Sequence, residues 1–164
     1  MADTTTATLR KTINTTLRSH LMSYLPASST SDPSHLNKDL NPTALRHISP
    51  SSFLLALGAP SDLTITPIDY IAQFGKELAP SKVKSVDYIS DVVIDTEGLF
   101  AAARSGYTNK FTDNGEEVQL EFAWFFEITE DGRKITKVRE FVDADVAGRY
   151  QRRAAEILKG LGKE

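Results

Sequence analysis

The sequence predicts an α+β fold: N-terminal helices wrap a cone-shaped, curved, mostly antiparallel sheet, and a further helix follows at the C-terminal end. Three observations support it. Apolar residues recur at helical spacing early in the chain, the second half has long strand-like segments, and Asn-Gly or Asp-Gly pairs join those segments as in hairpins. Helices that precede a meander pack on one face of it. Long strands curve, so we expect a cone around a pocket, formed by one domain of residues 1–164.

The first half of the chain should contain two main helices. The first begins near Thr6, after a disordered tail at residues 1–5, and ends at Pro26. The second has Thr66 as its N-cap, a proline as its first helical residue, and its end before Pro80. The stripe that predicts the first helix is Leu9, Ile13, Leu17, Leu21 and Leu25.

Between these helices the chain is expected to be irregular. The segment Ala27–Pro42 is rich in Ser, Asp, Asn and Pro, which predicts a long loop that can include one helical turn. A loop of this length often lies over a site, so we expect it to rim the pocket mouth and to be more mobile than the sheet. The stretch PTALRHI predicts another short helical turn, and SSFLLALG, Ser51–Gly58, predicts a short strand.

Four antiparallel strands should follow, joined by short turns, with a final helix at Asp145–Leu161 that carries apolar residues at helical spacing. The predicted strands are Ser85–Asp95, Leu99–Phe111, Glu117–Ile128 and Lys134–Val142.

Composition excludes several classes of protein and site. The net charge of −3 gives no basic surface for nucleic acid. The chain has no cysteine, and its three histidines lack metal-ligand spacing, so we predict no metal site. No apolar run reaches the roughly 18 residues that span a bilayer. The start lacks the apolar core of a secretory signal, which predicts a cytoplasmic protein without a membrane partner.

One carboxylate stands out. Glu121 lies in VQLEFAWFF, Val118–Phe126, a stretch that otherwise has the character of a buried strand. Burial of an unpaired charge is costly, so such a group is usually neutralised, paired or used in chemistry. The functional hypothesis is that Glu121 is a general acid or base in the pocket, with a pKa raised by burial, and that Tyr107 donates a hydrogen bond to a developing oxyanion. The alternative is a structural ion pair with Arg139 or Arg104.

The partners of Glu121 depend on hairpin register, because a slip of one residue exchanges the two faces of a strand. A two-residue turn at Asn114-Gly115 places Thr108 opposite Glu121, with Arg104 on the same face, whereas a bulged turn places Tyr107 opposite it. In the next hairpin a tight turn brings Glu140 to the face of Glu121. A bulged turn there brings Arg139 and Asp143 instead. We favour the bulged turn in both hairpins.

Small residues indicate where a ligand could lie. Ala103 and Ser105 belong to a run of small side chains that leave room in the sheet, unless large neighbours such as Trp124 fill it. Trp124, Phe125 and Phe126 are consecutive and therefore point to both faces. One face covers the pocket or core, and a second copy of the chain is the simplest cover for the other, which predicts a homodimer through the sheet face.

Two further residues are candidates. His47 lies between apolar residues and is either a catalytic base near neutral pH or a packing or capping histidine. Tyr24 is on the inner face of the first helix, which places it in the core or at the pocket wall.

The segment FEITEDGRKITKVREFVDADVAG resembles the closing hairpin of the fungal branch of SnoaL-like proteins, in the NTF2-like superfamily. There, a strand with an internal Glu is followed by a TEDG turn and a strand ending in EFVD. LRHISP, Leu45–Pro50, resembles the His-containing segment of the same branch. The resemblance extends from about Leu45 to Asp143.

The resemblance implies a cone of sheet and helices, and cofactor-free cyclisation, isomerisation, dehydration or epoxide opening of a polyketide, terpenoid or alkaloid intermediate of secondary metabolism. The superfamily also contains binding modules that do no chemistry, so an enzyme and a ligand-binding or protein-interaction module both stay open. We expect a small apolar substrate. The predicted catalytic residues are Glu121, Tyr107 and His47, and the predicted substrate-binding residues are Arg104, Ala103, Ser105, Phe125, Arg139, Asp143 and Tyr24.

Overall fold

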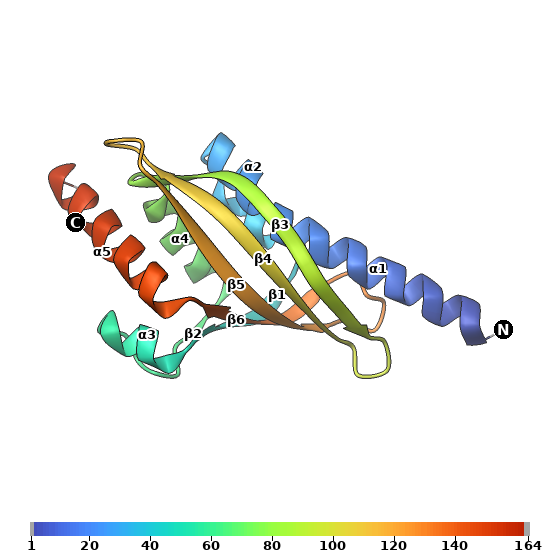
Figure 1. Cartoon of the computed structure of the whole chain (residues 1–164). Coiled ribbons are helices and arrows are strands. Elements are labelled where there is room, and N and C mark those ends of the chain that lie inside the picture. The colour runs from blue at the N-terminus through green and yellow to red at the C-terminus, as the bar shows by residue number, and fades with distance from the viewer. Residues whose placement is uncertain (1, 163–164) are drawn as a thin grey trace.

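The protein folds around one curved six-stranded sheet. The computed structural model describes residues 2–162, and the strand order is β2-β1-β6-β5-β4-β3. Figure 1 shows the sheet running diagonally across the molecule, with α1, α2 and α4 behind it and α3 and α5 gathered at one end. The strands are β1 (Leu40–Ser49), β2 (Thr64–Ile65), β3 (Ser81–Asp95), β4 (Phe100–Phe111), β5 (Glu117–Ile128) and β6 (Ile135–Val142).

The helices fill the concave side and one end of the sheet. They are α1 (Ala2–Met22), α2 (Tyr24–Thr30), the 3₁₀ helix η1 (Pro33–Asn37), α3 (Ser51–Ala56), α4 (Pro67–Glu77) and α5 (Ala144–Gly160). The predicted N-cap of α4 is confirmed, since the side chain of Thr66 accepts a hydrogen bond from the backbone N–H of Asp69. No helix within residues 2–162 is long and apolar enough to cross a membrane.

The predicted four-stranded antiparallel meander is confirmed, and the sheet continues beyond it. Strand β1 lies beside β6 in parallel, with Arg46 opposite Val138 and Ile48 opposite Glu140, and β2 pairs with β1 in the antiparallel sense. Sequence reasoning did not predict β1, because a parallel partner lies far away in the chain and leaves no local turn signal.

Four local predictions were wrong. Residues Ser51–Ala56 form α3 rather than a strand, and the stretch around PTALRHI belongs to β1 rather than to a helical turn. Pro26 lies in the first turn of α2, where a missing N–H is tolerated, so the break between α1 and α2 falls at Ser23 instead. The expected loop at 27–42 consists largely of α2, η1 and the start of β1. Residues 2–5 of the expected tail are helical, and Met1 lies outside the described residues.

The two faces of the sheet differ in character. On the concave face, apolar side chains of β4, β5 and β6 pack against α1 and α2 in a main core that includes Ile13, Leu17, Trp124 and Phe126. A second apolar cluster lies at the other end of the cone, where Phe53 and its neighbours in α3 and α5 pack against the strand ends. The convex face has no helix over it in Figure 1.

Candidate functional site

A cavity of about 370 Å³ opens between the concave face and the helices. Its walls are formed by β4, β5 and β6 on one side and by α3, α4 and α5 on the other. Most of the lining surface is apolar, and nine polar residues interrupt it, a composition found in small-molecule sites. Those polar residues are Tyr24, Tyr70, Gln73, Glu77, Tyr107, Asn109, Glu140, Tyr150 and Gln151.

A buried ion pair forms part of the sheet wall. Arg46 of β1 and Glu140 of β6 are 3 % and 7 % exposed, and the Arg46 Nη1 donates a hydrogen bond to Glu140 Oε2. Glu140 lines the cavity, and no described residue donates to its other oxygen, Oε1. The guanidinium also lies 3.8 Å from the centre of the Tyr70 ring, a cation–π contact. Burial alone would lower the pKa of Arg46, but the oxygens of Tyr24, Tyr70 and Glu140 raise it, so the guanidinium stays charged.

Three of the four tyrosines that line the cavity, Tyr24, Tyr70 and Tyr107, also pack in or against the main core. The Tyr24 and Tyr70 hydroxyl oxygens lie 3.1 Å apart and share a hydrogen bond. Burial raises the pKa of both, so they remain neutral donors and acceptors. The Tyr107 hydroxyl donates to the backbone carbonyl of Leu21 at 2.9 Å, and burial raises its pKa as well.

A second carboxyl group faces the cavity from the helical wall. Glu77 is the last residue of α4 and is partly buried. Its Oε1 accepts long hydrogen bonds from the side-chain amides of Gln73 at 3.5 Å and Gln151 at 3.4 Å. Within the described part of the chain, Glu77 has no ion-pair partner. Burial raises its pKa to about 7, and the negative charge of Glu140 acts in the same direction.

Solved structures share this architecture, although no family model and no curated protein matches the sequence. PrhC from Penicillium brasilianum superposes with a TM-score of 0.71 at 17% identity, covering 94% of this chain and 95% of that chain. BvnE pinacolase from Penicillium brevicompactum gives 0.69 at 14% identity, covering 90% and 94%. An NTF2-like protein from Burkholderia pseudomallei gives 0.57 at 12% identity, covering 84% and 95%. The chain has the NTF2-like fold. This confirms the cone expected from the sequence.

Glu121 lies outside this NTF2-like cone. Its side chain is exposed on the convex face, opposite Gly106 of β4, and it accepts a hydrogen bond from the Tyr88 hydroxyl at 2.7 Å. The prediction that Glu121 is buried in the pocket was therefore wrong. The expected contact with a Tyr, His or Arg side chain is confirmed, with Tyr88 in place of Tyr107.

The register explains this outcome. The loop Thr112–Gly115 between β4 and β5 has four residues, because Lys110 pairs with Glu117 and the Phe111 N–H donates to the Glu116 carbonyl. Neither register considered for this hairpin is the observed one. The two-residue turn had correctly placed Arg104 and Thr108 on the same face of the sheet as Glu121. The bulged turn that we favoured, which places Tyr107 on that face, was wrong for this hairpin.

In the hairpin between β5 and β6, Phe125 is opposite Arg139 and Trp124 is opposite Glu140. The favoured face assignment, with Arg139 and Asp143 on the side of Glu121, is confirmed for this hairpin. That side is the convex surface and not the pocket.

Four predicted substrate-binding residues consequently do not line the cavity. Arg104 is exposed and forms an ion pair with Asp91 at 3.5 Å. Arg139 is exposed on β6, and Phe125 packs beside Phe100 and Phe141 on the same convex face. Asp143 is the N-cap of α5, where it accepts from the backbone N–H groups of Asp145 and Val146.

The small residues of β4 face inward, but a neighbour fills the space beside them. Ala103 is buried opposite Trp124, and Ser105 accepts a hydrogen bond from the Trp124 Nε1 at 2.7 Å. Neither lines the cavity, so the alternative in which large aromatic side chains occupy the room is correct. His47 points away from the cavity as well, and its Nδ1 lies 3.2 Å from the Thr64 hydroxyl. Tyr24 and Tyr107 are the two predicted site residues that do line it.

Sequence reasoning missed Arg46, Glu140 and Glu77. The alternation in VREFV contained the signal for Glu140, since it shares a strand face with Val138 and Val142, which are both buried. Arg46 could be recognised only after β1 was known to be a strand. Glu77 follows Gln73 by one helical turn at the edge of the apolar face, a position that is usually solvated. Among the described residues, no group of His, Asp and Glu side chains could hold a metal ion.

Proposed function

We propose that this protein is an enzyme that cyclises, isomerises or opens an epoxide in a bulky apolar intermediate, of polyketide, terpenoid or alkaloid type, using acid–base chemistry of its own side chains. The observation that carries the proposal is the Glu140 carboxylate, paired with Arg46 at the wall of a mostly apolar cavity. Similarity in fold to BvnE pinacolase, and to a putative polyketide cyclase from Pseudomonas putida with a TM-score of 0.55 at 17% identity, supports the reaction class by analogy.

In this proposal Glu140 is the general base. The Arg46 Nη1 donates to Oε2, which leaves Oε1 to take a proton from the ligand. The low-polarity walls strengthen the interaction of that charge with a bound molecule. Tyr24 and Tyr70, which share one hydrogen bond, offer a neutral hydroxyl beside it that can stabilise developing negative charge.

The second candidate function is a binding module that holds an apolar ligand without chemistry. It is favoured if the Arg46–Glu140 pair only joins β1 to β6, because buried pairs often serve structure alone. The two functions differ in what happens when both charges are removed together.

The test uses 5-nitrobenzisoxazole, a small apolar compound whose ring opens when a base removes one proton. The wild-type protein should accelerate the opening, and Glu140→Gln should lower the rate by about 10²–10⁴-fold, as is typical for loss of one general base. Because this single variant leaves Arg46 buried and unpaired, it should also lose stability by about 3–5 kcal/mol.

The double variant Arg46→Met/Glu140→Leu separates the two effects. Replacing both members of a buried pair by apolar residues is often neutral for stability, so this variant should fold like the wild type and still lack turnover. A stable double variant that keeps the wild-type rate would overturn the proposal in favour of the binding module.

A further inference from the structure

The cavity contains a second carboxyl group that the base chemistry of Glu140 does not use. Glu77 comes from α4 and Glu140 from β6, so the two enter the same space from the helical wall and the sheet wall. Their surroundings differ in charge. Glu140 has a buried arginine against one oxygen, whereas Glu77 has only neutral amide partners.

The amide contacts determine which oxygen of Glu77 can hold a proton. Gln73, one helical turn earlier, and Gln151, from α5, both donate to Oε1. An oxygen that accepts two N–H groups acts as the carbonyl oxygen of a protonated carboxyl group. The proton then belongs on Oε2, which neither amide engages and which can donate to a ligand.

The charged and titratable groups around Glu77 favour this neutral form. Glu140 of β6 acts to raise the pKa of Glu77. Burial and the nearby Glu77 raise the pKa of Tyr150 of α5 to about 12, so its hydroxyl stays neutral. Gln73 and Gln151 carry no charge. A carboxyl group that is desolvated and next to a like charge is held as the acid near neutral pH.

We propose that Glu77 is the acid partner of Glu140, positioned by Gln73 and Gln151 to donate a proton from Oε2 to an oxygen of the ligand. This deepens the proposed function and rests on it. It also narrows the substrate class to apolar molecules with an acceptor oxygen, such as a carbonyl, a hydroxyl or an epoxide, at the end that faces α4 and α5. Two carboxyl groups whose environments separate their protonation states form a matched acid and base.

The proton balance for a ketone is as follows. Glu140 takes a proton from the carbon next to the carbonyl group, the C–H electron pair forms a C=C bond, and the carbonyl π pair takes the proton of Glu77. The resulting enol lies between a protonated Glu140 and an ionised Glu77. In a ketone with a β,γ double bond this intermediate is a dienol. The γ carbon takes the Glu140 proton with the β,γ electron pair, the enol C=C pair becomes the α,β double bond, and the O–H pair re-forms the carbonyl group as Glu77 takes back its proton. This gives the α,β-unsaturated isomer and restores both groups.

Binding of the ketone dye 6-propionyl-2-(dimethylamino)naphthalene tests the inference without knowledge of the substrate, because its emission shifts to the red when its carbonyl accepts a hydrogen bond. The wild-type protein should bind it about tenfold more tightly at pH 5.5 than at pH 8.5, which corresponds to about 1.4 kcal/mol, and the red shift should fade with rising pH. Glu77→Gln cannot ionise, so its binding should not depend on pH. Glu130→Gln, at an exposed turn, should behave as the wild type.

A direct titration completes the test. Carbon-13 NMR of protein labelled at the glutamate side-chain carboxyl should show one group that titrates near pH 7 and is missing in Glu77→Gln. Flat wild-type binding, an unchanged pH dependence in Glu77→Gln, or no such NMR signal would overturn the assignment of Glu77. Turnover of 5-nitrobenzisoxazole that still depends on Glu140 would then show that only the acid, and not the base, was misassigned.

Discussion

The Tyr88 hydroxyl donates a hydrogen bond to Glu121 Oε1 at 2.7 Å, reaching from β3 to β5 across the intervening strand β4. The contact is possible because Gly106 of β4 has no side chain. A Cβ at this position would lie 2.4 Å from Tyr88 Cε1. The aromatic ring therefore lies directly on the β4 backbone, and the glutamate serves as a link across the convex surface.

The first prediction concerns Glu121. Replacement of Glu121 by Gln should change the free energy of unfolding by no more than about 0.5 kcal/mol, because the side chain is exposed and a Gln carbonyl can still accept from Tyr88. Turnover of 5-nitrobenzisoxazole should stay at the wild-type rate. Urea denaturation and the initial rate measure the two quantities. A loss of turnover comparable to that of Glu140→Gln would show that Glu121 does reach the reacting molecule.

The meander was predictable from the sequence because its turn signals are local. Three of its four strands match the predicted bounds to within one residue at both ends, whereas β3 begins four residues earlier than expected. The register was not predictable, because Asn114-Gly115 lies in a four-residue loop whose length is set by the pairing of Lys110 with Glu117. That single difference moved Glu121 from the supposed pocket to the surface.

The site was predictable only in part. Tyr24 and Tyr107 were recognised as inward-facing, but Arg46 depends on the pairing of β1 with β6, whose residues are more than 90 positions apart. Local propensity carries no information about such a pair. Glu121 attracted attention because it interrupts an apolar run, whereas Glu140, in a more polar stretch, turned out to be the buried carboxylate.

The second prediction concerns Glu77 and the pH dependence of stability. Its folded-state pKa, about 7, lies above its ordinary value of 4.5. Between these values the folded protein holds a proton that the unfolded chain has lost, so the contribution of Glu77 to stability is present below pH 4.5 and disappears as the pH rises to 7. The change should reach about 2–3 kcal/mol. Urea denaturation of the wild type and of Glu77→Gln at several pH values isolates this contribution. If the free energies of unfolding of the two proteins change with pH in parallel, the prediction is contradicted.

The third prediction concerns His20, whose effect on the pH dependence of stability should be opposite in sign to that of Glu77. The side chain is fully buried, and neither ring nitrogen has a partner within the described residues. Burial, and the charge of Arg46 after it, lower its pKa to about 3 from 6.5. The unfolded chain therefore takes up a proton first, and stability falls as the pH drops from 6.5 toward 3. From pH 6.5 to 4.5 the wild type should lose about 2–3 kcal/mol more than His20→Leu. If the leucine variant shows the same acid sensitivity, other groups cause it.

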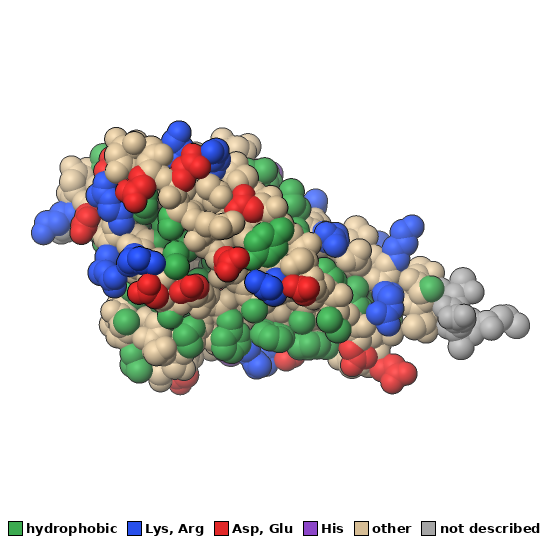
Figure 2. Space-filling model, viewed as in Figure 1, with side chains coloured by type: hydrophobic (Ala, Val, Ile, Leu, Met, Phe, Trp, Pro, Cys, Tyr) green, Lys and Arg blue, Asp and Glu red, His purple; other side chains and the backbone are tan. Residues whose placement is uncertain are grey.

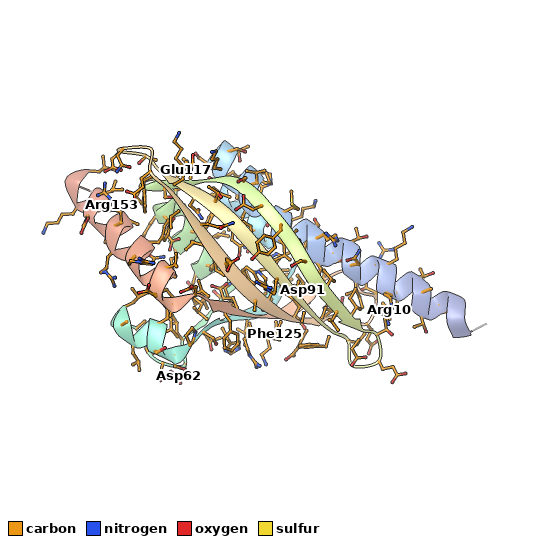
Figure 3. All side chains as sticks on the ribbon, in the orientation of Figure 1. Arg10, Asp62, Asp91, Glu117, Phe125 and Arg153 are labelled. Atoms are coloured by element: carbon orange, nitrogen blue, oxygen red, sulfur yellow. The ribbon has the colours of Figure 1, made fainter. Side chains whose placement is uncertain are left out.

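The fourth prediction is a homodimer that packs through the convex face of the sheet. Phe125 packs against Phe100 and Phe141, with ring centres 6.2 and 5.9 Å away, and Phe100 and Phe141 are 37% and 42% exposed. Figure 2 shows hydrophobic side chains gathered along the lower part of this face between charged ones, and Figure 3 places Phe125 there. We expect this group of exposed aromatic side chains to form the interface, because a two-fold axis would bring the group against its own copy.

Charge at a self-complementary apolar contact should prevent this association, because each substitution appears twice across the axis and buries two unpaired carboxylates. Sedimentation velocity at micromolar concentration should give twice the 18.1 kDa mass of the chain for the wild type and the single mass for Phe141→Glu. The control is Leu55→Glu, at a side chain that is 62% exposed on α3 and away from the sheet, which should remain dimeric. A wild type that sediments as the 18.1 kDa species at these concentrations would contradict the dimer, and dissociation caused by Leu55→Glu alone would move the interface to the end of the cone at α3.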